Sequence, residues 1–194
     1  MPRIYTDDDR AAIREKLLQG AAAALEQKSY KRIPVEKIAA SAGIAKGTFY
    51  HFFPSKEALF YEILVDIKKR NRAPLLELID AGIPSREEMI ECLMLRFTEM
   101  KSIFSYFPPA DVQEILAAIP DERKKADNDS VDFASLIGSR IRPLTPAEAE
   151  TIVGMFNILA LAASGRSSFQ IAGYEPAMQT YCTALTDFIL GNRA

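Results

Sequence analysis

The sequence predicts an all-α protein with two parts, a short N-terminal helix-turn-helix unit and a larger helical region. Apolar residues recur at helical spacing along the chain, whereas the strict alternation that is typical of half-buried strands is not found. Ser or Thr followed three residues later by an acid opens several of the periodic segments, as at a helix N-terminus. Near the N-terminus, two short helical segments are joined by a glycine-containing turn.

The first predicted helix begins with a capping box. Thr6 and Asp9 have the spacing for this motif, and apolar residues keep one face of the helix to about Gln27. Gly20 lies inside the helix, where glycine costs about 1 kcal/mol relative to alanine. We therefore expect a neighbouring element to pack closely at Gly20.

The next segments predict the helix-turn-helix. One short helix is expected over residues 34–42 and a second over residues 46–52, with Gly43 as the left-handed residue that ends the first. Ser55 is placed to cap a fourth helix.

The rest of the chain predicts longer helices. Ser85 with Glu88 and Thr145 with Glu148 are further capping boxes. Helices are expected over residues 85–106, 109–119, 130–141, 145–164 and 175–190, and a polar loop over 120–129. We predict one domain over residues 1–54, whose packing extends into the helix that starts at 55, and another over 55–194.

The charge of the chain is unevenly distributed. Residues 1–72 carry a net charge of +5 and the remainder −7, within a total of −2. A basic N-terminal part favours a polyanionic partner, although random variation of solvated faces is the alternative. The longest uncharged stretch near the C-terminal end, Thr151–Gly165, is shorter than the roughly 20 apolar residues of a membrane span. The N-terminus has no apolar run, so we expect a cytoplasmic protein without a membrane partner.

The second helix of the helix-turn-helix presents groups that suit a nucleic acid. Its candidate contact residues, donors to phosphates and base edges with one small residue among them, are Lys46, Gly47, Thr48, Tyr50 and His51. Gly47 would allow a close approach to DNA. Lys56, in the first turn of the following helix, adds a cation beside free backbone N–H groups. A structural corner of two helices without a DNA role is the alternative.

The stretch from Ile38 to Leu59 reads IAASAGIAKGTFYHFFPSKEAL and resembles the DNA-binding domain of the TetR family of bacterial repressors. The resemblance implies a three-helix head and a larger all-α body that binds a small ligand and dimerises through its last two helices. It implies phosphate contacts for Tyr50 and Lys56 and groove contacts for Lys46, Gly47 and Thr48. The chain departs from the family pattern at Ala45, where Ser or Thr often caps the recognition helix, and at Phe52, where many relatives carry His.

The body contains aromatic and methionine side chains that could line a ligand pocket or simply form its core. The candidate lining residues are Met94, Phe97, Met100, Phe104, Tyr106, Met155 and Phe156. Arg96 and Lys101 could meet an acidic ligand or face water.

The last two helices carry apolar residues at helical spacing, which the resemblance assigns to a dimer bundle and which could instead be the core of a monomer. The candidate dimer residues are Val153, Phe156, Leu159, Ala160, Ala163, Met178, Tyr181, Leu185 and Phe188. A two-fold dimer would place two recognition helices on a near-palindromic DNA site.

The sequence therefore predicts a ligand-responsive DNA-binding transcriptional regulator, a homodimeric repressor released from its operator by a small apolar or amphipathic effector. A DNA-binding regulator without a small-molecule ligand, constitutive or controlled by a protein, is the alternative. We do not expect an enzyme, because His51 is the single histidine and no catalytic or phosphate-binding motif is found. No metal or cofactor is expected.

Overall fold

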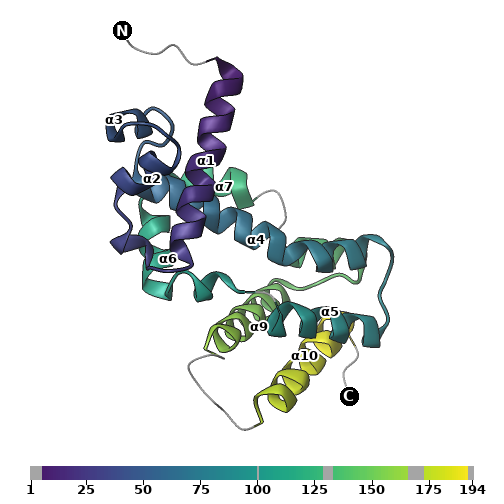
Figure 1. The fold of residues 1–194 in the computed structure, drawn as a ribbon. Coiled ribbons are helices and arrows are strands. Elements are labelled where there is room, and N and C mark those ends of the chain that lie inside the picture. Colours follow the sequence, from purple (N-terminus) through teal and green to yellow (C-terminus); the bar gives the residue numbers. More distant parts are fainter. Residues whose placement is uncertain (1–5, 100, 129–132, 166–172, 192–194) are drawn as a thin grey trace. The chain divides into compact units, whose positions relative to one another are not determined.

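A computed structural model describes residues 6–99, 101–128, 133–165 and 173–191 (Figure 1). In these residues the regular structure is helical and contains no β-strand, which confirms the all-α prediction. The helices are α1 Asp7–Leu25, η1 Tyr30–Arg32, α2 Val35–Ser41, α3 Lys46–Phe49, α4 Lys56–Asp80, α5 Arg86–Thr98, η2 Ile103–Ser105, α6 Pro109–Ala117, α7 Asp121–Asn128, α8 Phe133–Arg140, α9 Pro146–Ser164 and α10 Tyr174–Leu190.

The chain forms two compact units. The first contains Met1–Asp66 and Tyr106–Asp121, and the second contains Ile67–Ser105 and Glu122–Ala194. Helix α4 passes from the first unit into the second without a break, although Pro74 lies within it. The start of α4 belongs with the N-terminal helices, in line with the prediction that the packing of the first domain extends into this helix, whereas all of α6 was predicted within the domain over 55–194 and also belongs with them.

An aromatic cluster holds α6 in the first unit. Phe107, just before α6, packs against Tyr30 of η1 and Phe60 of α4, with ring centroids 6.2 Å from each, and all three side chains are buried. Lys31 adds ion pairs from η1 to α6, with its Nζ 3.1 Å from Asp111 Oδ1 and 2.7 Å from Glu114 Oε2. Segments about 75 residues apart in sequence are therefore parts of one core.

Helices α1 and α2 meet at Gly20, as the sequence predicts. A Cβ placed on Gly20 would lie 2.0 Å from Ser41 Oγ and 2.9 Å from Ser41 Cβ. The Ser41 hydroxyl is itself held, because it donates to the carbonyl oxygen of Ile38 at 2.7 Å. Only glycine allows α1 to approach α2 this closely.

The second unit has its core between α5, α9 and α10. Met89 and Leu93 of α5 are fully buried in one apolar cluster with Cys182 and Leu185 of α10. At the edge of this packing, the Arg86 guanidinium donates to both oxygens of Asp187, from Nε at 2.6 Å and from Nη2 at 3.0 Å. A bidentate pair of this kind fixes the register of the two helices.

Arg142 joins the end of α10 to the start of α9. Its Nε and Nη2 donate to the carbonyl oxygens of Ile189 and Phe188, at 3.1 and 2.7 Å, and its Nη1 donates to Glu148 Oε1 at 3.1 Å. Glu148 also completes the predicted capping box by accepting from the backbone N–H of Thr145. Hydrogen bonds from the backbone and hydroxyl of Thr145, followed by the Arg142 guanidinium, lower the pKa of Glu148 to about 2.

Three predicted segments differ from the structure. Residues 120–129, predicted as a loop, contain helix α7, in which acids at the start and Lys125 in the last turn complement the helix dipole. The helix predicted over 46–52 ends at Phe49, because the next backbone N–H groups, those of His51 and Phe52, donate to the carbonyl oxygen three residues back instead of four. The helix predicted over 85–106 ends at Thr98 and is followed by η2.

Helix α9 corrects the expectation about membrane-spanning length. By length and composition this helix is able to cross a membrane. It begins at Pro146, five residues before the uncharged stretch Thr151–Gly165, and is therefore longer than that stretch. This is weak support for a membrane role, since the core helix of a soluble protein passes the same test. However, only 17% of the tested window is buried, so α9 leaves an apolar outer face open in the single chain.

The contact at Gly20 predicts that the Gly20→Ala substitution destabilises the protein, although alanine favours helix formation. The added methyl group must push α1 away from α2, and overpacking of this kind costs about 1–3 kcal/mol. Chemical denaturation of the wild type, Gly20→Ala and the double variant with Ser41→Gly measures the effect. The double variant is expected to recover part of the loss. A more stable Gly20→Ala protein would contradict the close contact.

The lowered pKa of Glu148 predicts an acid-dependent contribution to stability. Because the folded pKa is about 2, below the ordinary value of 4.5, the contribution is complete above pH 4.5 and is lost as pH falls toward 2. The difference in unfolding free energy between wild type and Glu148→Gln should therefore be greatest at neutral pH and shrink over this window. The exposed neighbour variant Glu150→Gln is the control. A pH-independent difference would show that the carboxylate charge has no role.

Candidate functional site

The predicted helix-turn-helix is formed by α2, a tight turn and α3. Gly43 adopts a φ of 71°, and the backbone N–H of Ile44 donates to the carbonyl oxygen of Ala39 at 3.1 Å. This left-handed residue lets the chain reverse after α2 without the steric penalty of a Cβ. Ile38 and Phe49 are buried and set the two helices against each other.

The structure places the predicted DNA-binding residues on α3, on the turn after it and at the start of α4. Lys46, Gly47, Tyr50 and His51 are exposed, and Thr48 is half-buried. The Tyr50 side chain is 48% exposed, and its ring meets the buried Phe49 ring edge to face at 5.3 Å. The contact with Phe49 thus holds the Tyr50 ring in place, while the rest of the Tyr50 side chain is open to a partner.

The N-terminus of α3 lacks a side-chain cap. Ala45 occupies the N-cap position and makes no side-chain hydrogen bond, as its small side chain requires. In the next position, Lys46 Nζ lies 2.6 Å from Glu36 Oε1, with both side chains largely exposed. This pair raises the pKa of Lys46 and lowers that of Glu36.

Gly47 has no structural need to be glycine. Its φ is not positive, and a Cβ placed on it would have no heavy atom within 4 Å among its surroundings. In an open helical position, glycine lowers stability by roughly 0.5–1 kcal/mol relative to alanine. The chain therefore carries a small residue on its exposed surface without any compensating contact inside the fold.

Lys56 is less open than the sequence suggests. Its Nζ donates to the carbonyl oxygen of Lys31 at 3.2 Å and lies 5.4 Å from the centre of the Tyr30 ring. Burial lowers the pKa of this ammonium group. The side chain thus contacts η1 in the structure and would have to leave or share that carbonyl to reach a phosphate.

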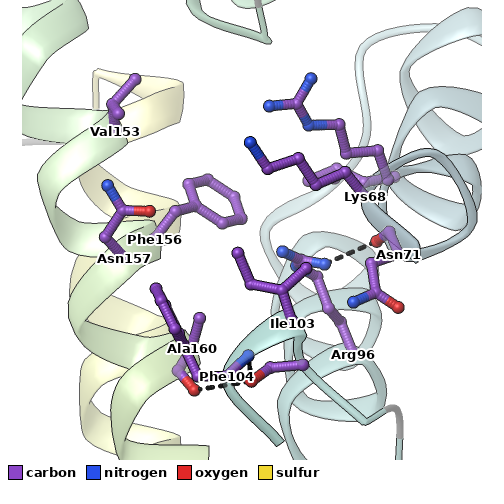
Figure 2. A pocket seen from close by; sticks show the side chains of 12 residues that line it. Lys68, Asn71, Arg96, Ile103, Phe104, Val153, Phe156, Asn157 and Ala160 are labelled. Carbon is purple, nitrogen blue, oxygen red and sulfur yellow. Dashed lines mark hydrogen bonds between the residues drawn. The ribbon is translucent and has the colours of Figure 1, made fainter. Parts of the chain in front are cut away.

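A pocket of about 100 Å³ lies within the second unit, between α4, α5, η2 and α9 (Figure 2). Its polar lining residues are Lys68, Asn71, Arg72, Arg96, Ser102 and Asn157. Its apolar lining residues are Leu75, Ile103, Phe104, Val153, Phe156 and Ala160.

The pocket wall is positively charged. Lys68, Arg72 and Arg96 line it, and none of its lining residues is an acid. Burial lowers the pKa of Lys68, with Arg72 adding to the effect, and the same two causes lower the pKa of Arg96 to about 10. The Arg96 guanidinium lies over the rings of Phe97 and Phe156, and its Nη1 donates to the carbonyl oxygen of Asn71 at 2.6 Å.

The pocket includes two of the predicted ligand-binding residues, Phe104 and Phe156. Three others, Met94, Phe97 and Met155, lie in or against the core and do not line it. Tyr106 belongs to the first unit, where its hydroxyl donates to Glu26 Oε1 at 3.0 Å. Met100 lies outside the described residues. Among the cations that line the pocket, Arg96 was a candidate from the sequence, whereas Lys68 and Arg72 were not.

The predicted dimer residues fall into three groups. Four are buried inside the chain and are corrected to core positions, because their side chains face α5 and the helices around it: Leu159, Ala160, Met178 and Leu185. Three are half-buried: Phe156, Ala163 and Phe188. Val153 and Tyr181 are exposed, together with Ile158 and Leu161, which sequence reasoning missed. The helical repeat places this pair on the side of α9 opposite the buried Leu159 and Ala160.

No group of three or more His, Cys, Asp or Glu side chains that could hold a metal is found in the part of the chain that the structure describes.

Comparisons with known proteins agree with the helix-turn-helix geometry. The profile of the bacterial regulatory proteins of the tetR family matches residues 17–63. The transcriptional regulator EthR of Mycolicibacterium smegmatis is 42% identical over 64 residues, which cover 33% of this chain and 28% of EthR. The transcriptional repressor KstR2 of the same organism is 33% identical over 92 residues, covering 47% of this chain and 45% of KstR2. The chain thus matches less than half the length of these curated relatives.

Solved structures match over nearly the whole chain. One from Rhodococcus sp., described as a TetR-family transcriptional regulator, covers 93% of this chain and 99% of its own, with a TM-score of 0.64 and 21% identity. A tetR-family transcriptional regulator from Streptomyces coelicolor covers 98% and 92%, with a TM-score of 0.55 and 16% identity. These likenesses concern the fold.

The relatives are named as regulators rather than as enzymes, in line with the expectation from the sequence. The matched helix-turn-helix and the curated relatives lead to one conclusion: residues 17–63 are similar to the DNA-binding part of the tetR family of bacterial regulatory proteins, and the chain shares the fold of solved TetR-family regulators.

Proposed function

We propose that this protein binds double-stranded DNA through α3 and regulates transcription in the cytoplasm as a ligand-responsive repressor. The observation that carries the DNA-binding role is Gly47. A helical, exposed glycine without neighbours lowers the stability of the chain, and its lack of a side chain is useful only to a partner that approaches from outside. The floor of a DNA major groove is such a partner.

The charges around α3 support a polyanionic partner. Lys46 on α3 is largely exposed, and the exposed Tyr50 follows it one helical turn later. Glu36 competes with a phosphate for the Lys46 ammonium group, since the two side chains are paired at 2.6 Å. DNA binding through Lys46 therefore replaces one ion pair by another, which favours specificity over raw affinity.

A homodimer is proposed through the outer faces of α9 and α10. Ile158 is 52% exposed and Leu161 42% exposed on α9, while Tyr181 on α10 is 48% exposed. Large apolar side chains grouped on neighbouring helices are typical of an interface. A two-fold axis at this surface would present two copies of α3 to a near-palindromic operator.

The pocket favours ligand response over the alternative of a regulator without a small-molecule effector. It lies in the unit that does not carry α3, and two of its walls, α4 and η2, lead directly along the chain into the first unit. A ligand that binds one arrangement of the units more tightly than another shifts the population toward it. Release from the operator is the outcome we propose.

Selection of random duplex DNA by the wild-type protein, read by sequencing, is expected to enrich an inverted repeat. On that duplex, Gly47→Ala should bind at least about tenfold more weakly, because the methyl group interferes with a close groove contact. The same variant should be more stable to denaturant by roughly 0.5–1 kcal/mol.

The matched control is Gly138→Ala, where the added Cβ has only an ordinary contact at 4.0 Å in the second unit. It should leave DNA affinity unchanged. Selection without enrichment at low salt, or a Gly47→Ala protein with wild-type affinity, would contradict the proposed use of α3.

The dimer proposal predicts that Ile158→Glu yields a folded monomer, because a charge at the centre of an apolar interface cannot be solvated there. Sedimentation equilibrium measures the mass, and circular dichroism checks the fold. Gln179→Glu, an exposed polar position on α10, is the control with the same added charge. A dimeric Ile158→Glu protein would move the interface elsewhere, and a wild type that partitions into lipid vesicles would favour a membrane role for this face.

A further inference from the structure

The pocket of the second unit is lined by three cations, and its lining residues include no acid. Lys68 and Arg72 lie one helical turn apart on α4, a spacing at which like charges repel. In the described part of the chain, Lys68 has no ion-pair partner, and its side chain extends from α4 across the pocket toward Phe156 of α9 (Figure 2). An uncompensated ammonium group held in a partly buried position lowers the stability of the fold.

Arg96 differs from the other tightly held arginines of this unit. Arg86 has the Asp187 carboxylate on its Nε and Nη2 edge, whereas Arg142 donates from that edge to two backbone carbonyl oxygens and from Nη1 to Glu148. Arg96 has a single hydrogen bond among the described residues, from Nη1 to the Asn71 carbonyl oxygen, and its Nε is buried without a partner. The edge that holds a carboxylate in Arg86 is thus unoccupied in Arg96.

Apolar side chains line the part of the pocket next to the cations. Phe156 and Ile103 lie on opposite sides of the pocket beside Lys68, with Phe104 below them (Figure 2). The volume of about 100 Å³ is smaller than the roughly 150 Å³ of an apolar cavity that accommodates benzene. The space therefore suits a charged headgroup with a short apolar part, and a ring would extend through the open side of the pocket.

We propose that this pocket binds a small organic anion. Its oxyanion group, a carboxylate or a phosphate, lies between Lys68 and the Nε edge of Arg96, and its short apolar part contacts Phe156 and Ile103. The inference rests on the proposed function in one respect only, that this anion is the effector of the regulator. It narrows the effector from an apolar or amphipathic molecule to an acid.

Isothermal titration of the full-length protein with matched pairs tests the charge requirement. Benzoate is compared with benzamide, hexanoate with hexanamide, and phenyl phosphate with phenol, at equal ionic strength adjusted with sodium chloride. The anions should bind and their neutral partners should not. The pair of benzoate and phenyl phosphate tells which oxyanion is preferred. Neutral partners that bind as tightly as the anions, or anions that fail to bind at millimolar concentration, would overturn the proposal.

Variants locate the anion. Lys68→Gln should weaken binding of the preferred anion by about tenfold, the size expected for one charge-assisted hydrogen bond. Lys69→Gln, the exposed neighbouring position on α4, should leave binding within about twofold of wild type. Arg96→Gln should weaken binding further, and Lys68→Gln decides the question if Arg96→Gln does not fold. Unchanged binding to Lys68→Gln would place the anion elsewhere.

The effector role is measured separately by release of the enriched operator duplex. Anion binding without release would uphold the pocket assignment and contradict the regulatory one. Release by a neutral apolar compound, with no anion bound, would uphold ligand response and overturn the anion.

Discussion

The packing of Phe107 against Tyr30 and Phe60 is the constraint on which the division of the chain depends. It brings α6 into the unit that carries the helix-turn-helix, and the ion pairs of Lys31 with Asp111 and Glu114 reinforce it from the surface. Because η2 lies directly before Phe107, the chain that lines the pocket at Ser102–Phe104 enters the first unit within a few residues. Helix α4 does the same from the other end, since it contributes Lys68 to the pocket and Phe60 to the aromatic cluster.

This connectivity gives a physical basis for the proposed ligand response. Two stretches of backbone that line the pocket, α4 and η2, continue without a linker into the unit that contains α3. A ligand with different affinities for two arrangements of these stretches shifts their populations, and only that difference in affinity is transmitted. The buried hydrogen bond from Ser102 Oγ to the Ala160 carbonyl oxygen, at 3.0 Å, ties η2 to α9 and so includes the face beside the proposed dimer in the same framework.

The sequence predicts features that are encoded within a few residues of each other. The three capping boxes at Thr6, Ser85 and Thr145 form as expected, because each needs only a hydroxyl and an acid three positions apart. Gly20 is identified as a close contact because glycine within a helix is locally unfavourable. The assignment of α6 to the first unit depends on an aromatic contact between distant segments, which no local pattern records. Likewise, Leu159 and Ile158 are adjacent in sequence, and only the packing of α9 decides which one faces the core and which faces outward.

The candidate sites coincide with residues that lower the stability of the folded chain and make no contact within the fold that offsets this loss. Ala45 leaves the recognition helix without a cap, Gly47 weakens it further, and Lys68 with Arg96 places cations where no described acid meets them. Natural sequences break the local rules of stability mainly at functional sites, where binding of a partner offsets the loss. The two proposed sites would take two different anions, a polyanion at the bare surface of α3 and a small anion between the charged side chains of the pocket.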